Sequence, residues 1–171
     1  MASIVVQIIL GIVFANWFEW AAHKYVMHDL GRRWRWLSWH WMQHHRNSAL
    51  NKFHDKDYLK SPFDWNSRAK EILGLALLAL CVSPVSLLAP VMYATMVTWT
   101  VLYYVTHAKS HRNPEWAKKY VPWHYEHHMG QAPDANFCVV MPLWDIILGT
   151  RVYHETDQHG RLVKFGRSMR K

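Results

Sequence analysis

The sequence predicts an all-α integral membrane protein with about three membrane-embedded helices and a cytoplasmic helical cap. The first observation is the distribution of charge. All 20 lysines and arginines lie in residues 24–70 or 109–171, so residues 1–23 and 71–108 contain neither. The second is that these two windows are also the most apolar parts of the chain. The mean hydropathy of −0.18 therefore hides two segments that suit a bilayer.

The first window, residues 1–22, is expected to form one membrane helix. Ser3 to Phe18 is apolar and is long enough to span only if the helix continues towards His23. A signal peptide is the alternative, but no basic residue precedes the apolar stretch and no small-residue cleavage site follows it. Lys24 and three arginines at 32, 33 and 35 come next, so the positive-inside rule places the N-terminus outside.

The second window, residues 72–107, is expected to form a helical hairpin. A single uncharged helix over residues 72–106 would measure roughly 50 Å, against about 30 Å for a hydrocarbon core. Pro84 and Pro90 favour a turn that returns the chain to the same side. Residues 23–71 and 108–171 then form the cytoplasmic cap of one domain, 1–171. A soluble protein with a buried apolar hairpin is the alternative.

The apolar segment Phe137–Gly149 belongs to this cap rather than to the spans. It is too short to cross a bilayer and contains Pro142 and Asp145. We expect an interfacial helix there. Because glycines are few and strand alternation with turn signals is absent, helices are expected throughout the chain.

Ten of the 13 histidines fall into four clusters, called boxes here. The boxes are His23-x4-His28, His40-x3-His44-His45, His107-x3-His111 and His124-x2-His127-His128. Positions i, i+3 and i+4 share a helix face, so each of the last three boxes would present two imidazoles together, and the adjacent extra histidine could reach a second metal. His23 and His28 diverge by about 140° on a regular helix, so either the helix ends between them or they serve different sites. The other three histidines are expected in surface loops: His54, His154 and His159.

The boxes predict a histidine-rich dimetal site in the cap. They lie at the cytoplasmic ends of the predicted spans or in polar segments on that side, so they are expected to converge. Zinc sites need three or four protein ligands, whereas ten imidazoles indicate two metals of high coordination number. Two iron ions would activate dioxygen, and zinc could replace iron in purified protein. A histidine-rich metal transporter or metal-binding protein is the alternative of another class, although a transporter would place histidines within its spans.

The box sequences HKYVMH, HWMQHH, HAKSH and HYEHH resemble the fatty acid hydroxylase and sterol desaturase superfamily of membrane di-iron enzymes. The segment Asn136–Thr150 resembles the closing motif of many members, with Cys138 where the family often has glycine. The first box and the chain length are also similar to those of bacterial carotenoid hydroxylases. The resemblance implies oxygen-dependent hydroxylation of a lipid, or alternatively its desaturation. It implies these iron ligands: His23, His28, His40, His44, His45, His107, His111, His124, His127 and His128.

The expected setting is a bacterial inner membrane, with the metal site and the C-terminus in the cytoplasm. The sequence contains no P-loop, Gly-x-Gly-x-x-Gly turn or iron–sulfur motif. Electrons for dioxygen reduction are therefore expected from a separate ferredoxin-like protein and its reductase. No nucleic-acid partner is expected, because a cationic surface against the bilayer explains the net charge of +8.

Four residues near the boxes are candidates for hydrogen bonds to histidine ligands. Glu19 lies one turn before His23 and is expected to accept the N–H of that imidazole or of a neighbouring one. Asp145 either orients a box histidine or caps a turn. Asp134 and Asn136 closely follow the last box, and they either contribute hydrogen bonds to it or belong to loop structure.

Overall fold

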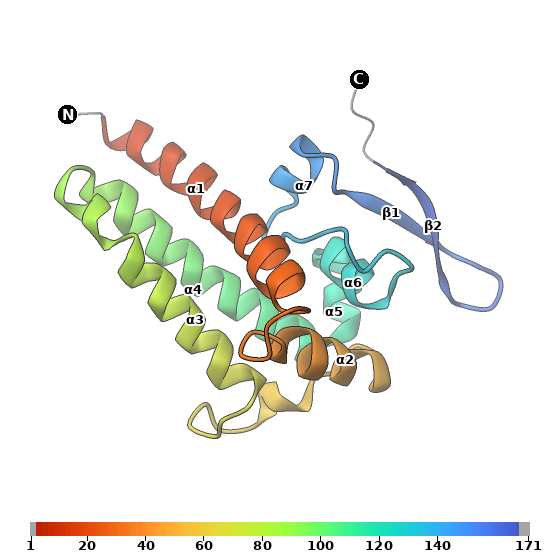
Figure 1. The fold of residues 1–171 in the computed structure, drawn as a ribbon. Helices are drawn as coiled ribbons and strands as arrows, with labels where there is room; N and C mark the ends of the chain where they lie inside the picture. The colour runs from red at the N-terminus through yellow and green to blue at the C-terminus, as the bar shows by residue number, and fades with distance from the viewer. Residues whose placement is uncertain (1–2, 168–171) are drawn as a thin grey trace.

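Three long helices, α1 (Ile4–Ala21), α3 (Ser67–Cys81) and α4 (Pro90–Arg112), run alongside one another in the computed structural model, which describes residues 3–167 (Figure 1). Helix α4 packs against both α1 and α3. The prediction of a mostly helical protein is confirmed. Residues 1–2 and 168–171, the outermost parts of the predicted first span and cap, lie outside the described residues.

Helix α1 begins at Ser3, whose hydroxyl accepts a hydrogen bond from the backbone N–H of Val6. It passes without a break into η1, a π-helix over Ala22–Leu30. Together they form the one helix in residues 3–167 that is long and apolar enough to cross a membrane, Ile4–Leu30. Because α3 and α4 do not meet the same requirements of length and hydropathy, three spans stay a prediction.

The chain reverses direction between α3 and α4. Helix α3 begins at Asn66, whose side chain caps the backbone N–H of Ala69. A short 3-10 helix, η4 (Ser83–Leu87), connects the two helices, and α4 starts with Pro90 at its first position. Proline is tolerated there because the first helical N–H has no partner within the helix.

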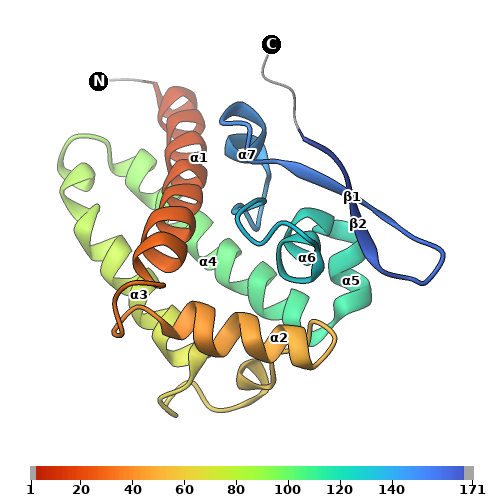
Figure 2. The ribbon, with the colours of Figure 1, turned by 45° about the vertical axis from the view of Figure 1, so that its right-hand side comes forward.

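Short elements cover one end of the long helices (Figure 2). In chain order they are η2, a π-helix (His40–His45), α2 (Arg46–Leu50), η3, a 3-10 helix (Lys56–Leu59), α5 (Pro114–Tyr120) and α6 (Pro122–Met129). Helix α7 (Leu143–Ile147) lies beside α1 instead (Figure 2), where the indole of Trp144 donates to the carbonyl of Val13. Proline opens α5 and α6 in the same way as α4. Of the predicted interfacial helix Phe137–Gly149, only α7 is helical.

The all-α prediction is wrong at the C-terminal end of the described chain. Strands β1 (Val152–Thr156) and β2 (Leu162–Arg167) form an antiparallel hairpin, with Thr156 opposite Leu162. Its turn places Gly160 at φ +75°, a conformation that favours glycine. Two short runs of β-branched and aromatic residues around a glycine turn are the ordinary signal for a hairpin, and here it takes precedence over the helical trend of the chain.

Candidate metal centre

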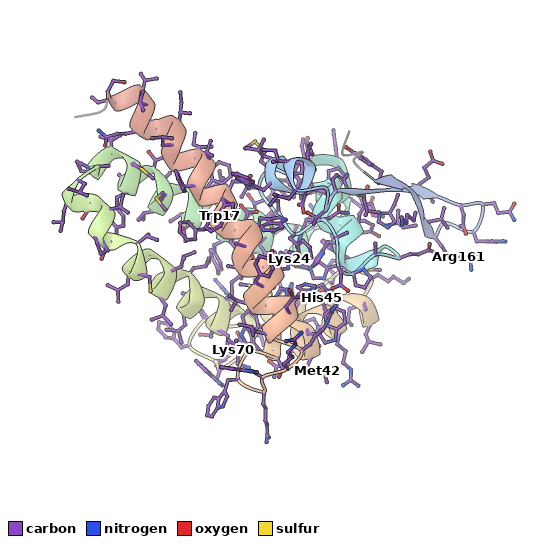
Figure 3. All side chains as sticks on the ribbon, turned by 45° about the horizontal axis from the view of Figure 1, so that its top comes forward. Trp17, Lys24, Met42, His45, Lys70 and Arg161 are labelled. Carbon is purple, nitrogen blue, oxygen red and sulfur yellow. The ribbon has the colours of Figure 1, made fainter. Side chains whose placement is uncertain are left out.

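The four boxes meet inside the capped end of the molecule, and nine of the ten box histidines form two groups. Within each group, one ring nitrogen from every residue lies within 4.8 Å of those of the others. The first group consists of His23, His28, His40, His45 and His127. The second group consists of His44, His107, His111 and His128. Figure 3 shows His45 among side chains that converge from several elements.

The tenth box histidine, His124, borders the second group. Its ring is buried, and its Nε2 lies 3.1 Å from the Nε2 of His111. The structure thus brings all ten predicted residues into one buried region.

The π-helix η1 explains how His23 and His28 reach the same group. Hydrogen bonds in a π-helix join residues i and i+5, so side chains five apart face the same way. The two ring centroids are 5.0 Å apart. Both alternatives from the sequence, a helix end between the two histidines or separate sites, are therefore wrong.

The second π-helix, η2, divides the second box between the two groups. His40 and His45, five residues apart, join the first group, with ring centroids 4.8 Å apart. His44 joins the second group. The rings of His40 and His44 are also adjacent, as expected, with centroids 5.2 Å apart, but the wider π-helical turn of η2 assigns the two histidines to different groups.

The third and fourth boxes lie on regular α-helices. His107 and His111, four residues apart on α4, both belong to the second group. On α6, His128 belongs to the second group, and His127 turns to the first. The second and fourth boxes therefore each contribute to both groups.

Backbone carbonyls fix three of the rings. The Nδ1 atom of His23 donates to the carbonyl of Phe137 at 2.5 Å, and that of His127 donates to Ala135 at 2.6 Å. The Nδ1 atom of His111 donates to the carbonyl of Phe53 at 2.9 Å. Since a carbonyl only accepts, each Nδ1 carries the proton, and Nε2 is left as the free lone-pair donor.

Carboxylates fix two rings of the second group. Asp55 Oδ2 lies 2.8 Å from His44 Nδ1, and Glu71 Oε1 lies 2.5 Å from His107 Nδ1. Both carboxylates are buried. The hydroxyl of Tyr58 donates to the other oxygen of Glu71 at 2.8 Å and accepts from His107 Nδ1 at 3.0 Å, so it links this ring to the carboxylate. Hydrogen-bonded carboxylates raise the basicity of a histidine ligand and fix its orientation.

Sequence reasoning missed Asp55, Tyr58 and Glu71. Glu71 carried a usable signal, because it is the last charged residue before the uncharged stretch 72–106. An acid at the edge of an apolar segment is costly unless it is paired. Asp55 lies in a polar segment among other charged residues and carries no comparable signal.

The predicted contact between Glu19 and a box imidazole is wrong. The buried carboxylate of Glu19 accepts from the indole of Trp99 at 2.9 Å and from the backbone N–H groups of Val139 and Val140. The extended segment after the last box leaves these N–H groups without partners in secondary structure, so the carboxylate satisfies them. Glu19 therefore acts on His23 indirectly, by holding the segment that contains the Phe137 carbonyl.

Asp145 caps a turn, the second of its two predicted alternatives. Its carboxylate accepts from the backbone N–H groups of Phe137 at 2.9 Å and Cys138 at 2.8 Å. The hydroxyl of Thr150 donates to it at 2.6 Å. Hydrogen bonds to the carboxylates of Asp145 and Glu19 thus fix four consecutive residues, 137–140, in the loop before α7.

The two remaining candidates differ in their distance from the histidines. Asn136 adopts φ +60°, and its side chain bonds the backbone N–H of Val152 at 2.8 Å, which makes it part of the loop structure. Asp134 Oδ1 lies 3.6 Å from His28 Nδ1 and 2.6 Å from a guanidinium nitrogen of Arg32. This half-exposed carboxylate is therefore at the edge of the first group.

Burial favours the neutral form of several box histidines, as the pKa of His127 and of three others indicates. It lowers the pKa of His127 to about 4, although the hydrogen bond to Ala135 opposes the shift. Burial and the neighbouring imidazoles together lower the pKa of His40, His45 and His128 well below the ordinary value. A neutral imidazole is the form that binds a metal ion.

The donor set fits metal ions. The Nε2 atoms of His44 and His107 and both ring nitrogens of His128 are buried without a hydrogen-bond partner among residues 3–167. Leaving such a group unpaired costs about 1–3 kcal/mol. Coordination of a metal by these nitrogens would remove that cost, and imidazole suits iron and zinc alike.

Of the three histidines outside the boxes, two are exposed as expected, His54 and His159. The surface-loop prediction for His154 is wrong, because its side chain is fully buried and its Nδ1 lies 3.8 Å from Glu126 Oε2. The β-hairpin, which was not predicted, carries His154 back against α6. A Cβ at Gly130 would lie 2.5 Å from the His154 ring, so glycine permits this close approach.

Comparison with known proteins gives one match. The sequence model described as "Fatty acid hydroxylase" matches residues 8–150, a range that includes all four boxes. No curated protein and no solved structure matches the chain.

Proposed function

Because the chain belongs to the fatty acid hydroxylase family, we propose that it is a membrane di-iron oxidoreductase that hydroxylates a C–H bond of a lipid. The family indicates a metal-dependent enzyme of the hydroxylase and desaturase type. The observation that carries the proposal is the pair of adjacent groups formed by nine buried imidazoles. Two groups linked by shared boxes favour a dinuclear centre over a single structural metal.

In this proposal, the ten box histidines hold two iron ions through ring nitrogens. If bound there, iron would supply the activation of dioxygen; the overall hydroxylation would put one oxygen atom into the substrate C–H bond and release the other as water, with consumption of two electrons and two protons. Zinc is a plausible substitute in purified protein, since the same nitrogens bind it well.

The other residues of the site orient and protect these ligands. The carbonyls of Phe137, Ala135 and Phe53, the carboxylate of Asp55 and the Tyr58 hydroxyl beside Glu71 hold Nδ1 of their histidines. The Nε2 atoms of these histidines would thereby be left to bind the metals. Burial of the rings excludes water, which strengthens electrostatic interactions within the site and prevents side reactions.

The proposal includes a membrane setting and a separate electron donor. The apolar helix Ile4–Leu30 would anchor the chain with the N-terminus outside, which leaves the boxes and the C-terminus in the cytoplasm of a bacterium. A ferredoxin-like protein and its reductase would supply the electrons there. The lipid substrate would reach the site from the bilayer, and no nucleic acid takes part.

Lipid mass spectrometry of cells that express the chain tests this function. We expect a lipid that gains one oxygen atom, and the gain should disappear in His44→Ala and persist in the exposed control His54→Ala. Loss of two hydrogens instead would identify a desaturase. If neither mass change occurs in cells whose protein retains two metals per chain, that result would contradict an enzymatic function. It would favour a metal-binding protein.

A further inference from the structure

Helix α5 and the end of α4 form a cationic surface at the capped end of the molecule (Figure 1). Residues 109–120 contain four lysines or arginines, all exposed, and a single acid, Glu115. Of these four cations, only Lys118 forms an ion pair within residues 3–167, with Glu115 at 2.7 Å. We call this region the α5 surface and define it by Lys109, Trp116, Lys118, Lys119 and Tyr120.

Aromatic rings lie under the charges of the α5 surface. Lys109 Nζ lies 4.4 Å from the centroid of the Trp116 ring. Lys118 Nζ lies 5.2 Å from the centroid of the Tyr125 ring. Tyr120, which is 54% exposed, lies beside Trp116 with ring centroids 5.5 Å apart. Aromatic side chains are enriched at protein–protein interfaces, and an excess of positive charge attracts an acidic partner. The composition of the α5 surface therefore suits the docking of an acidic protein.

The ring of Phe53 connects this surface to the second histidine group. Phe53 is fully buried, and its ring packs against that of the half-buried Tyr125, with centroids 4.8 Å apart. It also stacks on the imidazole of His111, with centroids 4.5 Å apart and an angle of 26° between the planes. The same ring contacts His124 and His128. Three rings in direct contact therefore reach from beneath Lys118 to a predicted metal ligand.

The backbone of Phe53 is held in an unusual conformation. Its φ is +78°, a region that bulky residues rarely adopt. The carbonyl of Phe53 accepts from His111 Nδ1 at 2.9 Å, and its N–H donates to the carbonyl of Ser48 at 2.7 Å. Ala117 and Val121 pack against the ring. Because such a conformation persists only where the surrounding contacts determine it, the fold itself fixes the ring of Phe53 against His111.

The first histidine group has a comparable ring, Trp41, but not a comparable charge. Trp41 contacts His28 and His45, with ring centroids 5.4 and 5.1 Å away. Arg32 lies over this indole at 4.1 Å, and a nitrogen of the same guanidinium lies 2.6 Å from Asp134 Oδ1. The ion pair reduces the positive charge above Trp41. An acidic partner is therefore attracted less strongly there than to the α5 surface.

We propose that the α5 surface docks an acidic one-electron carrier, an iron–sulfur protein of the ferredoxin class, and that electrons enter the metal centre through the contacts of Tyr125 and Phe53. The inference rests on the proposed function, because it requires redox-active iron at the box histidines. At each encounter the reduced cluster of the carrier loses one electron and is oxidised, and the metal centre gains that electron. Two encounters supply the two electrons of one hydroxylation.

Calorimetric titration of an acidic 2Fe–2S ferredoxin into the iron-loaded protein, in nanodiscs of phosphatidylcholine, tests the docking surface. Lys109→Gln combined with Lys119→Gln should weaken binding about tenfold, because both charges are free to attract the ferredoxin. The matched control, Arg33→Gln combined with Lys164→Gln, removes two exposed cations elsewhere and should leave binding unchanged. Equal weakening by the two pairs would show a response to net charge alone and would overturn the assignment to the α5 surface.

Oxidation of reduced ferredoxin, followed by its cluster absorbance in anaerobic stopped-flow mixing, tests the route. At saturating ferredoxin, Tyr125→Leu should slow electron transfer at least about fivefold, because it opens a gap between the surface and Phe53. Tyr125→Phe keeps the ring and should preserve the rate. Zinc-loaded protein should bind ferredoxin without oxidising it, because zinc has no redox chemistry. An unchanged rate in Tyr125→Leu, with full iron content, would overturn the route.

Anionic lipid is the other partner that a cationic surface could meet. Phosphatidylglycerol that co-purifies with the protein in detergent is therefore measured in both double variants. We expect the same amount in each. If Lys109→Gln with Lys119→Gln lowers this lipid and leaves ferredoxin binding unchanged, the α5 surface contacts lipid head groups and the proposal is wrong.

The outcomes separate this surface from the proposed hydroxylation. If ferredoxin binds and is oxidised as expected but no lipid gains oxygen, the docking assignment stands and the proposed function fails. If lipid gains oxygen but Lys109→Gln with Lys119→Gln does not weaken ferredoxin binding, the proposed function stands and the docking assignment fails.

Discussion

The two histidine groups differ in what holds the outer nitrogens of their rings. In the first group, His23 and His127 donate to the carbonyls of Phe137 and Ala135, which belong to a single loop. In the second group, His44 and His107 face the buried carboxylates of Asp55 and Glu71, and one ring, that of His111, donates to the carbonyl of Phe53.

The two histidine groups therefore depend on different parts of the chain. The first group depends on the conformation of the loop after box four, which Glu19 and Asp145 fix through its backbone. The second depends on two acidic side chains, which make its ligands more basic and add negative charge beside a metal ion. Variants can therefore weaken one group and leave the other intact.

Removal of a ligand should have the largest effect. His127→Ala should deplete the metal of the first group and His44→Ala that of the second, and each should abolish activity, because a dinuclear centre needs both metals. Metal analysis should find about one metal per chain in each variant instead of two. The exposed histidine variant His159→Ala should retain both. Two metals in His44→Ala would contradict the division into two groups.

Acid should destabilise the metal-free protein through rings such as His127. Its pKa is about 4 in the folded chain against 6.5 in an unfolded chain, so between these values the unfolded state binds more protons. The free energy of unfolding should therefore fall as the pH drops from 6.5 to 4, by on the order of 3 kcal/mol for this one ring. Urea unfolding across this range measures it.

A matched variant separates the contribution of His127 from that of other rings. His127→Gln removes the titrating group and should reduce the slope of stability against pH between 4 and 6.5. An unchanged slope would show that His127 does not control this acid sensitivity.

Removal of a carboxylate should weaken only the second group. Glu71→Gln keeps the shape of the side chain but removes its charge beside His107, so metal affinity of the second group should fall by about 10- to 100-fold. Competition with a chelator, read out as metals retained per chain, measures this loss. Glu115→Gln, an exposed control on α5, should behave like the unchanged protein. Equal loss of metal from both groups would contradict the conclusion that only the second group depends on Glu71.

Loosening of the loop should have the smallest effect, and on the first group. Glu19→Gln weakens the hydrogen bonds to Val139 and Val140 and should cost about 1 kcal/mol of stability, which lowers Tm by about 2–4 °C. Thermal unfolding measures it, and the chelator assay should show loss from the first group before the second. Preferential loss from the second group would mean that Glu19 does not act through the loop.

The sequence by itself determined the helical class, the reversal between Pro84 and Pro90, and the set of ten histidines to examine. These features depend on local patterns, because an uncharged apolar run, a proline and a short repeat of histidines carry their meaning within a few residues. The same patterns indicated the family, which the match over residues 8–150 establishes.

The division of the box histidines into two groups, and the partners that hold their rings, could be seen only in the tertiary structure. The division depends on the π-helical turns of η1 and η2, which bring histidines five residues apart to one side, whereas the spacing alone suggested α-helical pairs. Glu71 and Phe137 contact the boxes across large sequence separations, and Asp55 contacts His44 from the far side of a loop, so no local pattern encodes these contacts. His154 became buried for the same reason, since its environment depends on where the β-hairpin packs and not on its neighbours in the chain.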